Sequence, residues 1–152
     1  MACNNCYQKS TLSASTATSS TVAAAALVPF NTVNLHTGAS ISFSAGDSSI
    51  NIVKPGLYEV TFDASVSVTA ATAATLSFQI NRAGVAITGA TASYTSSATT
   101  DVGSVSITTL VRVSELCPCA GNGANSIAIT VSNISTVAAL MANANITVVK
   151  LA

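Results

Sequence analysis

The sequence predicts an all-β protein of about ten short strands. Apolar and polar residues alternate with a period of two in several segments, turn signals separate these segments, and no helical pattern exceeds one turn. Many short strands at close spacing are typical of a sandwich, a barrel or a jelly roll. The length of 152 residues fits one domain with a substantial core.

The strands are expected in order along the chain from residue 22 onward. The clearest is Leu57 to Val68, which follows the turn at Lys54-Pro55-Gly56 and alternates along its whole length. Its apolar face begins with Tyr58, Val60 and Phe62. The other expected strands lie at residues 22–29, 32–36, 41–43, 50–52, 76–80, 85–87, 105–113, 127–131 and 145–151. The Ala-rich stretch 69–74 is expected to be a loop.

The last strand, Asn145 to Leu151, is apolar on both faces. Ile146 and Val148 lie on one face, and Val149 and Leu151 on the other. A strand buried on both sides lies centrally in a sheet or under a neighbouring element.

Residues 1–21 differ from the rest of the chain. They are rich in Ser, Thr and Ala, contain two cysteines and show no clear periodicity. We interpret them as an extended, Cys-bearing N-terminal connector, followed by one domain over residues 22–152.

The composition argues against charged partners. Only 7% of the residues are charged, five basic residues balance five acidic ones, and the net charge is zero. A polybasic segment is absent from the sequence, so we expect neither nucleic acid nor a membrane surface as a partner. A neutral surface gives little repulsion between copies, which favours self-association. We see no basic leader before an apolar run and expect an extracellular location to be reached by cell lysis or another route.

Four cysteines form two pairs, Cys3 with Cys6 in the connector and Cys117 with Cys119 in a Gly-rich loop between two expected strands. Disulfides between subunits are the first interpretation. Unpaired or locally paired thiols without an assembly role are the second. A zinc site of four thiolates is the third, and the single-residue spacing of Cys117 and Cys119 disfavours it.

Other candidates for chemistry are isolated in the sequence. His36 is the single histidine and is expected in a loop. Glu59 and Asp63 share a strand face at roughly 13 Å, which is too far for a glycosidase pair. Arg82 and Arg112 are expected to pair with carboxylates across strands, with an anion site as the alternative. We therefore expect no enzyme activity, no cofactor and no metal. The Asn-x-Ser/Thr sequences at Asn133 and Asn145 are interpreted as chance.

The order of several segments resembles a known family. They are VPFNT, SINIVKPGLYEVTFDASV, LSFQINRAGVAI, SVSITTLVRV, NSIAITVSN and the C-terminal ANITVVKLA. Together they resemble the tumour-necrosis-factor/complement-type jelly roll, and more narrowly the C-terminal domain of collagen-like glycoproteins on bacterial spore surfaces. The resemblance covers residues 22–152, and the chain lacks the collagen stalk of those glycoproteins.

The resemblance implies a ten-strand jelly-roll sandwich that forms a homotrimer without catalytic activity. The candidate trimer-interface residues are Tyr58, Phe62, Ile146, Val148, Val149 and Leu151. It further implies a structural subunit of a stacked fibre or coat on a spore surface, with an anchoring coat protein and a tip protein as further partners. The alternative is a bacteriophage virion decoration or a receptor-binding fibre head. Such a head needs exposed aromatic residues, and Tyr94 is the one clear candidate.

The connector suggests how trimers are joined. Residues 7–21, if extended, span about 50 Å, close to the ~40 Å length of the longest expected strand. A connector running along a neighbouring trimer could bring Cys3 and Cys6 to the neighbour's Cys117 and Cys119. Such disulfides need an oxidising environment.

Overall fold

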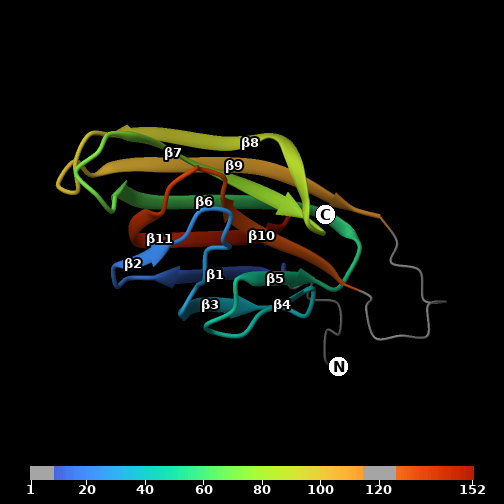
Figure 1. The fold of residues 1–152 in the computed structure, drawn as a ribbon. Coiled ribbons are helices and arrows are strands. Elements are labelled where there is room, and N and C mark those ends of the chain that lie inside the picture. The colour runs from blue at the N-terminus through green and yellow to red at the C-terminus, as the bar shows by residue number, and fades with distance from the viewer. Residues whose placement is uncertain (1–8, 115–125) are drawn as a thin grey trace, which may run out of the picture.

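The computed structural model describes residues 9–114 and 126–152, which form two β-sheets packed face to face (Figure 1). These residues contain eleven strands and no helix, and therefore none that could cross a membrane. The strands are β1 (Thr11–Thr16), β2 (Ser20–Val22), β3 (Thr32–Thr37), β4 (Ile41–Ser42), β5 (Ser49–Ile52), β6 (Gly56–Val68), β7 (Ala74–Arg82), β8 (Val85–Ser96), β9 (Gly103–Val113), β10 (Ile127–Asn133) and β11 (Ala139–Lys150).

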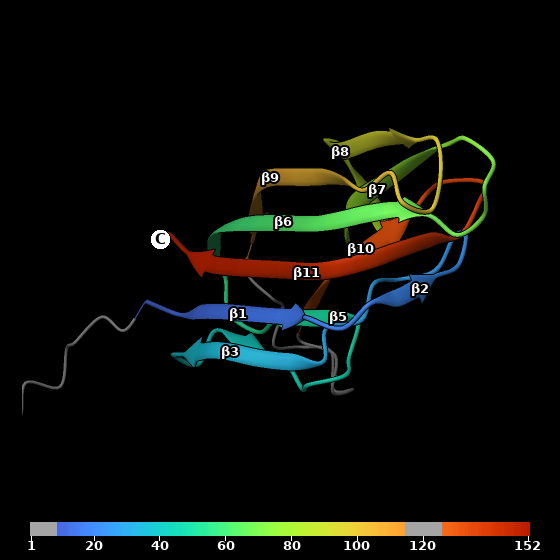
Figure 2. The same ribbon diagram turned by 90° about the vertical axis from the view of Figure 1, so that its left-hand side faces the viewer.

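Both sheets are antiparallel, and the chain passes repeatedly from one to the other. Sheet A has the order β3-β1-β11-β6-β9, with β2 paired to the beginning of β11. Sheet B has the order β4-β5-β10-β7-β8. Figure 2 shows the strands of sheet A side by side in front, with sheet B behind them. This two-sheet arrangement is a jelly roll, so the all-β class predicted from the alternating segments is confirmed.

The N-terminal boundary differs from the expected one. Residues 11–21, expected in the connector, contain β1 and most of β2, and β1 pairs with β11 on one side and β3 on the other. The buried positions of β1 are Leu12, Ala14 and Thr16. Because two of these three side chains are small or polar, the alternation gives almost no hydrophobic signal. The segment 22–29, expected as a strand, is mostly turn and loop, with one isolated bridge at Leu27.

The core is built from the inward-facing side chains of the long strands. Along β6 the buried side alternates as expected, from Tyr58 to Val68. Phe62 lies at the centre, with its ring 6.3 Å from that of Phe30 and 6.0 Å from that of Phe78. These three buried rings join β6, β7 and the loop before β3 in one aromatic cluster.

The last strand is central, as its sequence predicted. β11 lies between β1 and β6 and begins earlier than expected, at Ala139. Its register against β6 shifts between Ala142 and Asn145. Asn143 adopts a positive φ of 51° there, a conformation that Asn tolerates better than most residues. The bulge keeps Met141, Ala144 and Ile146 on the buried side of the sheet.

Replacing Phe62 with Ala tests the aromatic cluster. We expect Phe62→Ala to lower the free energy of unfolding by about 3–5 kcal/mol, because the lost ring leaves a cavity between two other rings. Urea denaturation followed by circular dichroism measures this. Val102→Ala, at a side chain 58% exposed, is the control and should change stability by less than about 0.5 kcal/mol. Equal losses in the two variants would contradict the central role of Phe62.

Candidate functional site

The isolated candidates for chemistry that the sequence offered lie apart from one another in the structure. His36 lies in β3, not in a loop, and its Nε2 is 2.9 Å from the carbonyl oxygen of Ile41. Within residues 9–114 and 126–152, no group of three or more His, Cys, Asp or Glu side chains is placed to hold a metal ion.

The outer face of sheet A is covered by hydroxyl groups. One row across four strands contains Ser13, Thr147, Thr61 and Thr108. The hydroxyls of Thr61 and Thr108 are hydrogen-bonded at 3.2 Å. Glu59 and Asp63 lie on this face on either side of Thr61 and belong to different rows. Sheet B carries similar pairs, Thr75 with Thr95 and Ser77 with Ser93.

Four of the six candidate interface residues belong to the core of the sandwich. Tyr58, Phe62, Ile146 and Val148 have no exposed surface, so they cannot contact another copy while the sandwich is closed. The alternation in the sequence identifies two faces of a strand, and the bulkier apolar face is the one the two sheets cover. Val149 is partly exposed on the outer face of sheet A, and Leu151 is 42% exposed beyond the end of β11.

The four cysteines, Cys3, Cys6, Cys117 and Cys119, lie outside the described residues. The structure does describe the strands that adjoin these cysteine-bearing segments in the sequence. Register puts Thr11 of β1 level with Val149, Glu59 and Leu110, close to the end of β9. The described chain therefore begins at the same end of the sandwich at which β9 finishes and β10 starts (Figure 1).

Tyr94, near the end of β8, holds the loop between β8 and β9. Its hydroxyl donates to Asp101 Oδ1 at 2.6 Å, and the N–H and hydroxyl of Ser97 donate to Oδ2 at 2.7 and 2.8 Å. These hydrogen bonds hold the pKa of Asp101 below its usual range. The bond from Tyr94 contributes most, and the two bonds from Ser97 add to it. Its ring covers Gly103, where a Cβ atom would collide with it. Tyr94 is therefore not a free aromatic anchor.

The two Asn-x-Ser/Thr sequences have structural roles as well. Asn133 is fully buried, and its side-chain amide donates to the carbonyl oxygens of Val22, Ala23 and Val137 at 3.0, 3.2 and 3.1 Å. Asn145 lies within β11 and pairs with both neighbouring strands. These placements agree with interpreting both sequences as chance.

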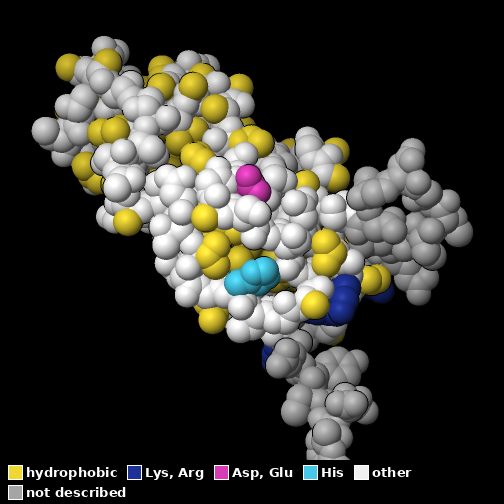
Figure 3. All heavy atoms as spheres, turned by 90° about the horizontal axis from the view of Figure 1, so that it is seen from below, with side chains coloured by type: hydrophobic (Ala, Val, Ile, Leu, Met, Phe, Trp, Pro, Cys, Tyr) yellow, Lys and Arg dark blue, Asp and Glu magenta, His cyan; other side chains and the backbone are white. Residues whose placement is uncertain are grey.

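All five basic side chains gather at one end of the sandwich, which the sequence did not reveal. We call this end the cationic pole and define it by Lys9, Lys54, Arg82, Arg112 and Lys150. Lys9 precedes β1, and Ser10 accepts a bond from the N–H of Lys150 at 2.9 Å. Lys54 precedes β6, whose Leu57 pairs with Arg112. In Figure 3 the Lys and Arg side chains in view lie at this end, and the opposite end shows none.

Local contacts fix the cationic pole. The hydroxyl of Tyr58 donates to the carbonyl of Lys54 at 2.7 Å and holds the turn before β6. The N–H of Leu57 donates to the carbonyl of Ala152 at 2.9 Å. A Cβ atom at Gly56 would collide with this carbonyl and with Cε of Lys150, so glycine is needed for the chain end to lie here.

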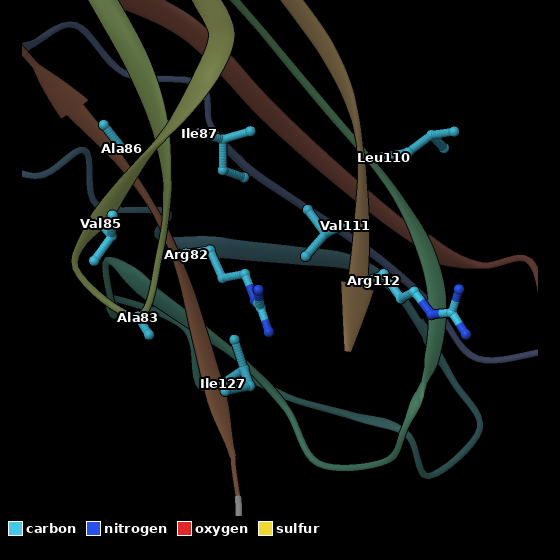
Figure 4. Close-up of a pocket in the computed structure, with 9 residues that line it drawn as sticks. All are labelled: Arg82, Ala83, Val85, Ala86, Ile87, Leu110, Val111, Arg112 and Ile127. Atoms are coloured by element: carbon cyan, nitrogen blue, oxygen red, sulfur yellow. The ribbon is translucent and has the colours of Figure 1, made fainter. Parts of the chain in front are cut away.

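Two cavities open at the cationic pole. The first, of about 530 Å³, lies between β8 and β9 with Ile87, Val111 and Ile127 in its wall. Arg82 points into it, whereas Arg112 leaves β9 on the other side (Figure 4). Arg112 also lines the second cavity, beside Pro55, Gly56 and Ala152. The two guanidinium groups thus lie beside neighbouring cavities.

The opposite end, which we call the distal pole, consists of the loops 23–27, 69–73, 97–102 and 134–138. Its exposed large side chains are apolar: Leu27, Val102, Ile134 and Val137. Its one charged residue is Asp101, whose two carboxylate oxygens are occupied by Tyr94 and Ser97. The two ends of the molecule therefore differ sharply in charge.

The sequence matches no family model and no curated protein. Solved structures do match over nearly the whole chain. The globular domain of zebrafish complement 1qA superposes with a TM-score of 0.67 at 12% identity, covering 95% of this chain and 98% of that one. The structure of Eiger TNF from S. frugiperda gives 0.65 at 14% identity, covering 95% and 92%.

A virion protein shares the fold too. The PRD1 vertex protein P5 superposes with a TM-score of 0.56 at 21% identity, covering 94% of this chain and 97% of that one. At these identities the likeness shows the fold. The described domain thus has a jelly-roll fold similar to that of tumour-necrosis-factor and complement domains, and the jelly-roll fold that the sequence resemblance implied is confirmed.

The Asp101 hydrogen bonds predict a specific dependence of stability on pH. The pKa of Asp101 is lower in the folded than in the unfolded protein, so its contribution is present above the unfolded value and is lost as the pH falls through the folded value. We expect Asp101→Asn to lower Tm by a few degrees near about pH 7, and this difference to shrink near about pH 2.

Differential scanning calorimetry at both pH values checks this. The control is Asp47→Asn, which removes the same charge from an exposed turn and should give a smaller shift that depends less on pH. An Asp101→Asn deficit of constant size at both pH values would contradict the assigned role of the carboxylate.

Proposed function

We propose that the chain is a structural, self-assembling subunit of an extracellular fibre or coat on a bacterial spore, built from homotrimers joined through their cysteines. The likeness to complement and tumour-necrosis-factor domains supports the trimer. The scarcity of charge supports close packing between copies. The outer face of sheet A is the observation that carries the proposal.

This face is broad, polar and nearly uncharged. Apart from Glu59, Asp63 and Arg112, its central strands present Ser, Thr and Asn side chains with a few aliphatic ones. Hydroxyl groups in register can exchange hydrogen bonds with another copy, and removing them from water costs less than removing charges. Leu110, 57% exposed, and Val149 lie in one row and form an apolar strip for contact, which Glu59 interrupts between them.

The connector that carries Cys3 and Cys6 is shorter than the sequence implied, so these cysteines can reach less far. Because residues 11–22 belong to the chain's own sheet A, the connector ends at residue 10 and cannot run along a whole neighbouring trimer in this fold. Cys6 lies five residues before Thr11, a reach of roughly 17 Å, and β1 and β9 are about three strand spacings, or ~14 Å, apart. We propose disulfides between subunits that meet at the cationic pole.

A charge placed in the apolar strip should separate the trimer. We expect Leu110→Asp to convert the trimer to monomer at micromolar concentration, because an unpaired carboxylate in an interface is poorly tolerated. Light scattering under reducing conditions measures the mass. Val102→Asp is the matched control, since Val102 is 58% exposed at the distal pole. A wild-type protein that is monomeric at this concentration would refute the trimer.

The cysteines predict a covalent ladder on non-reducing gels after boiling. We expect wild type to show it and both Cys3→Ser/Cys6→Ser and Cys117→Ser/Cys119→Ser to lose it, because each disulfide needs one partner from each pair. If only the first variant loses it, the connectors crosslink to one another. If wild type shows no ladder, the disulfides are local or absent and the proposed joint fails.

A virion decoration or receptor-binding fibre head is the second candidate. The likeness to the PRD1 vertex protein P5 favours it. The engagement of Tyr94 by Asp101 weighs against a receptor-binding head, which needs free aromatic residues. Negative-stain electron microscopy separates the two candidates: a fibre subunit forms filaments without reductant, whereas a fibre head stays as single trimers with or without it.

A further inference from the structure

We infer that the cationic pole binds a phosphate-bearing polymer on those subunits whose pole is not covered by a neighbour joined there through the cysteines, as proposed above. All five basic residues of the chain lie at this end of the sandwich. Lys9, Lys54, Arg82 and Arg112 are exposed, and Lys150 is partly exposed. Concentrated positive charge on an otherwise neutral surface attracts anions specifically to that surface.

The described chain supplies no acidic surface to match this pole. Asp101 is occupied by Tyr94 and Ser97 at the distal pole. Asp47 lies in the turn before β5, and Asp63 lies in the middle of sheet A. Close to the pole, the described residues provide one acidic side chain, Glu59, whereas Glu115 lies outside the described residues. The acidic side chains described there are therefore fewer than the five cations, so the pole can attract an anionic partner.

The arrangement suits a chain-like anion. Arg82 points into one cavity and Arg112 borders both, so the two guanidinium groups lie on different sides of β9 (Figure 4). A single small anion cannot contact both groups and the three lysines together. A polymer that crosses the pole can contact them in turn, with aliphatic Ile87, Val111 and Ile127 lining its path.

Phosphate is the anion that we infer. The three lysines bind phosphate as point charges, and the planar fork of arginine matches phosphate as well as carboxylate. Within residues 9–114 and 126–152, the exposed large hydrophobic side chains include no aromatic residue on which a base could stack. The ligand is therefore expected to be recognised through its phosphates alone, without readout of bases.

The test uses the full-length chain in reductant and labelled inorganic polyphosphate as the probe. We expect binding, measured by fluorescence anisotropy, that weakens as salt rises. Arg82→Gln, Arg112→Gln and Lys54→Gln should each raise Kd about fivefold and lower the slope of log Kd against log salt by about one. Thr99→Glu at the distal pole makes the same change in net charge and should leave Kd unchanged.

Three results would overturn the inference. The first is no polyphosphate binding at low salt. The second is an equal loss in Thr99→Glu and Arg82→Gln, which would mean that net charge alone matters. The third is tighter binding of polyglutamate than of polyphosphate at equal charge, which would assign the pole to carboxylates. None of these results depends on the mass or the disulfide ladder of the protein, so the proposed assembly stands or fails separately.

Discussion

The sandwich depends on the insertion of β11 between β1 and β6. This strand pairs with β1, β2 and β6, and its buried side contributes Met141, Ala144, Ile146 and Val148 to the core. It is also the last strand of the chain, so sheet A cannot be completed until the C-terminus is in place. Gly56 extends this constraint to the final residue, because a side chain there would expel Ala152 from its hydrogen bond with Leu57. Such long-range pairing slows folding and makes the closed sandwich strongly cooperative.

The fold was predictable where side chains are large and strands are long. Tyr58 to Val68 alternates so clearly that strand, period and turn could be read directly, and the two-faced apolar pattern at residues 145–151 correctly indicated a central strand. β1 was missed because Ser, Thr and Ala at alternating positions carry little hydrophobic contrast, although Leu12 and Ala14 are fully buried. Its stability comes from backbone pairing with two neighbours, and pairing between residues more than a hundred positions apart leaves no local signal in one sequence.

The functional surfaces were harder to predict. Alternation divides a strand into two faces without saying which face another subunit meets, and the bulky set containing Tyr58 and Phe62 fills the core. Tyr94 looked free because its partner Asp101 lies across a loop. The cationic pole was invisible for a geometrical reason: its five residues are spread from Lys9 to Lys150 and meet only because antiparallel strands return the chain repeatedly to one end. The sequence analysis did consider an anion site at Arg82 and Arg112. No feature of the neighbouring sequence favoured it over ion pairs between these arginines and carboxylates across strands.

The nearly uncharged sheet faces and the cationic pole form contacts that differ in their dependence on salt. Contacts through hydroxyl-covered sheet faces depend weakly on salt, because few charges are removed from water when they form. Contacts through the cationic pole depend strongly on salt, because bound cations are released from the polymer. If two subunits meet at their cationic poles, their junction covers both poles, and only a subunit that is not joined in this way leaves its own pole free. A phosphate contact at such a free pole would attach the assembly to its support, so that raising the salt detaches the assembly without dissolving it.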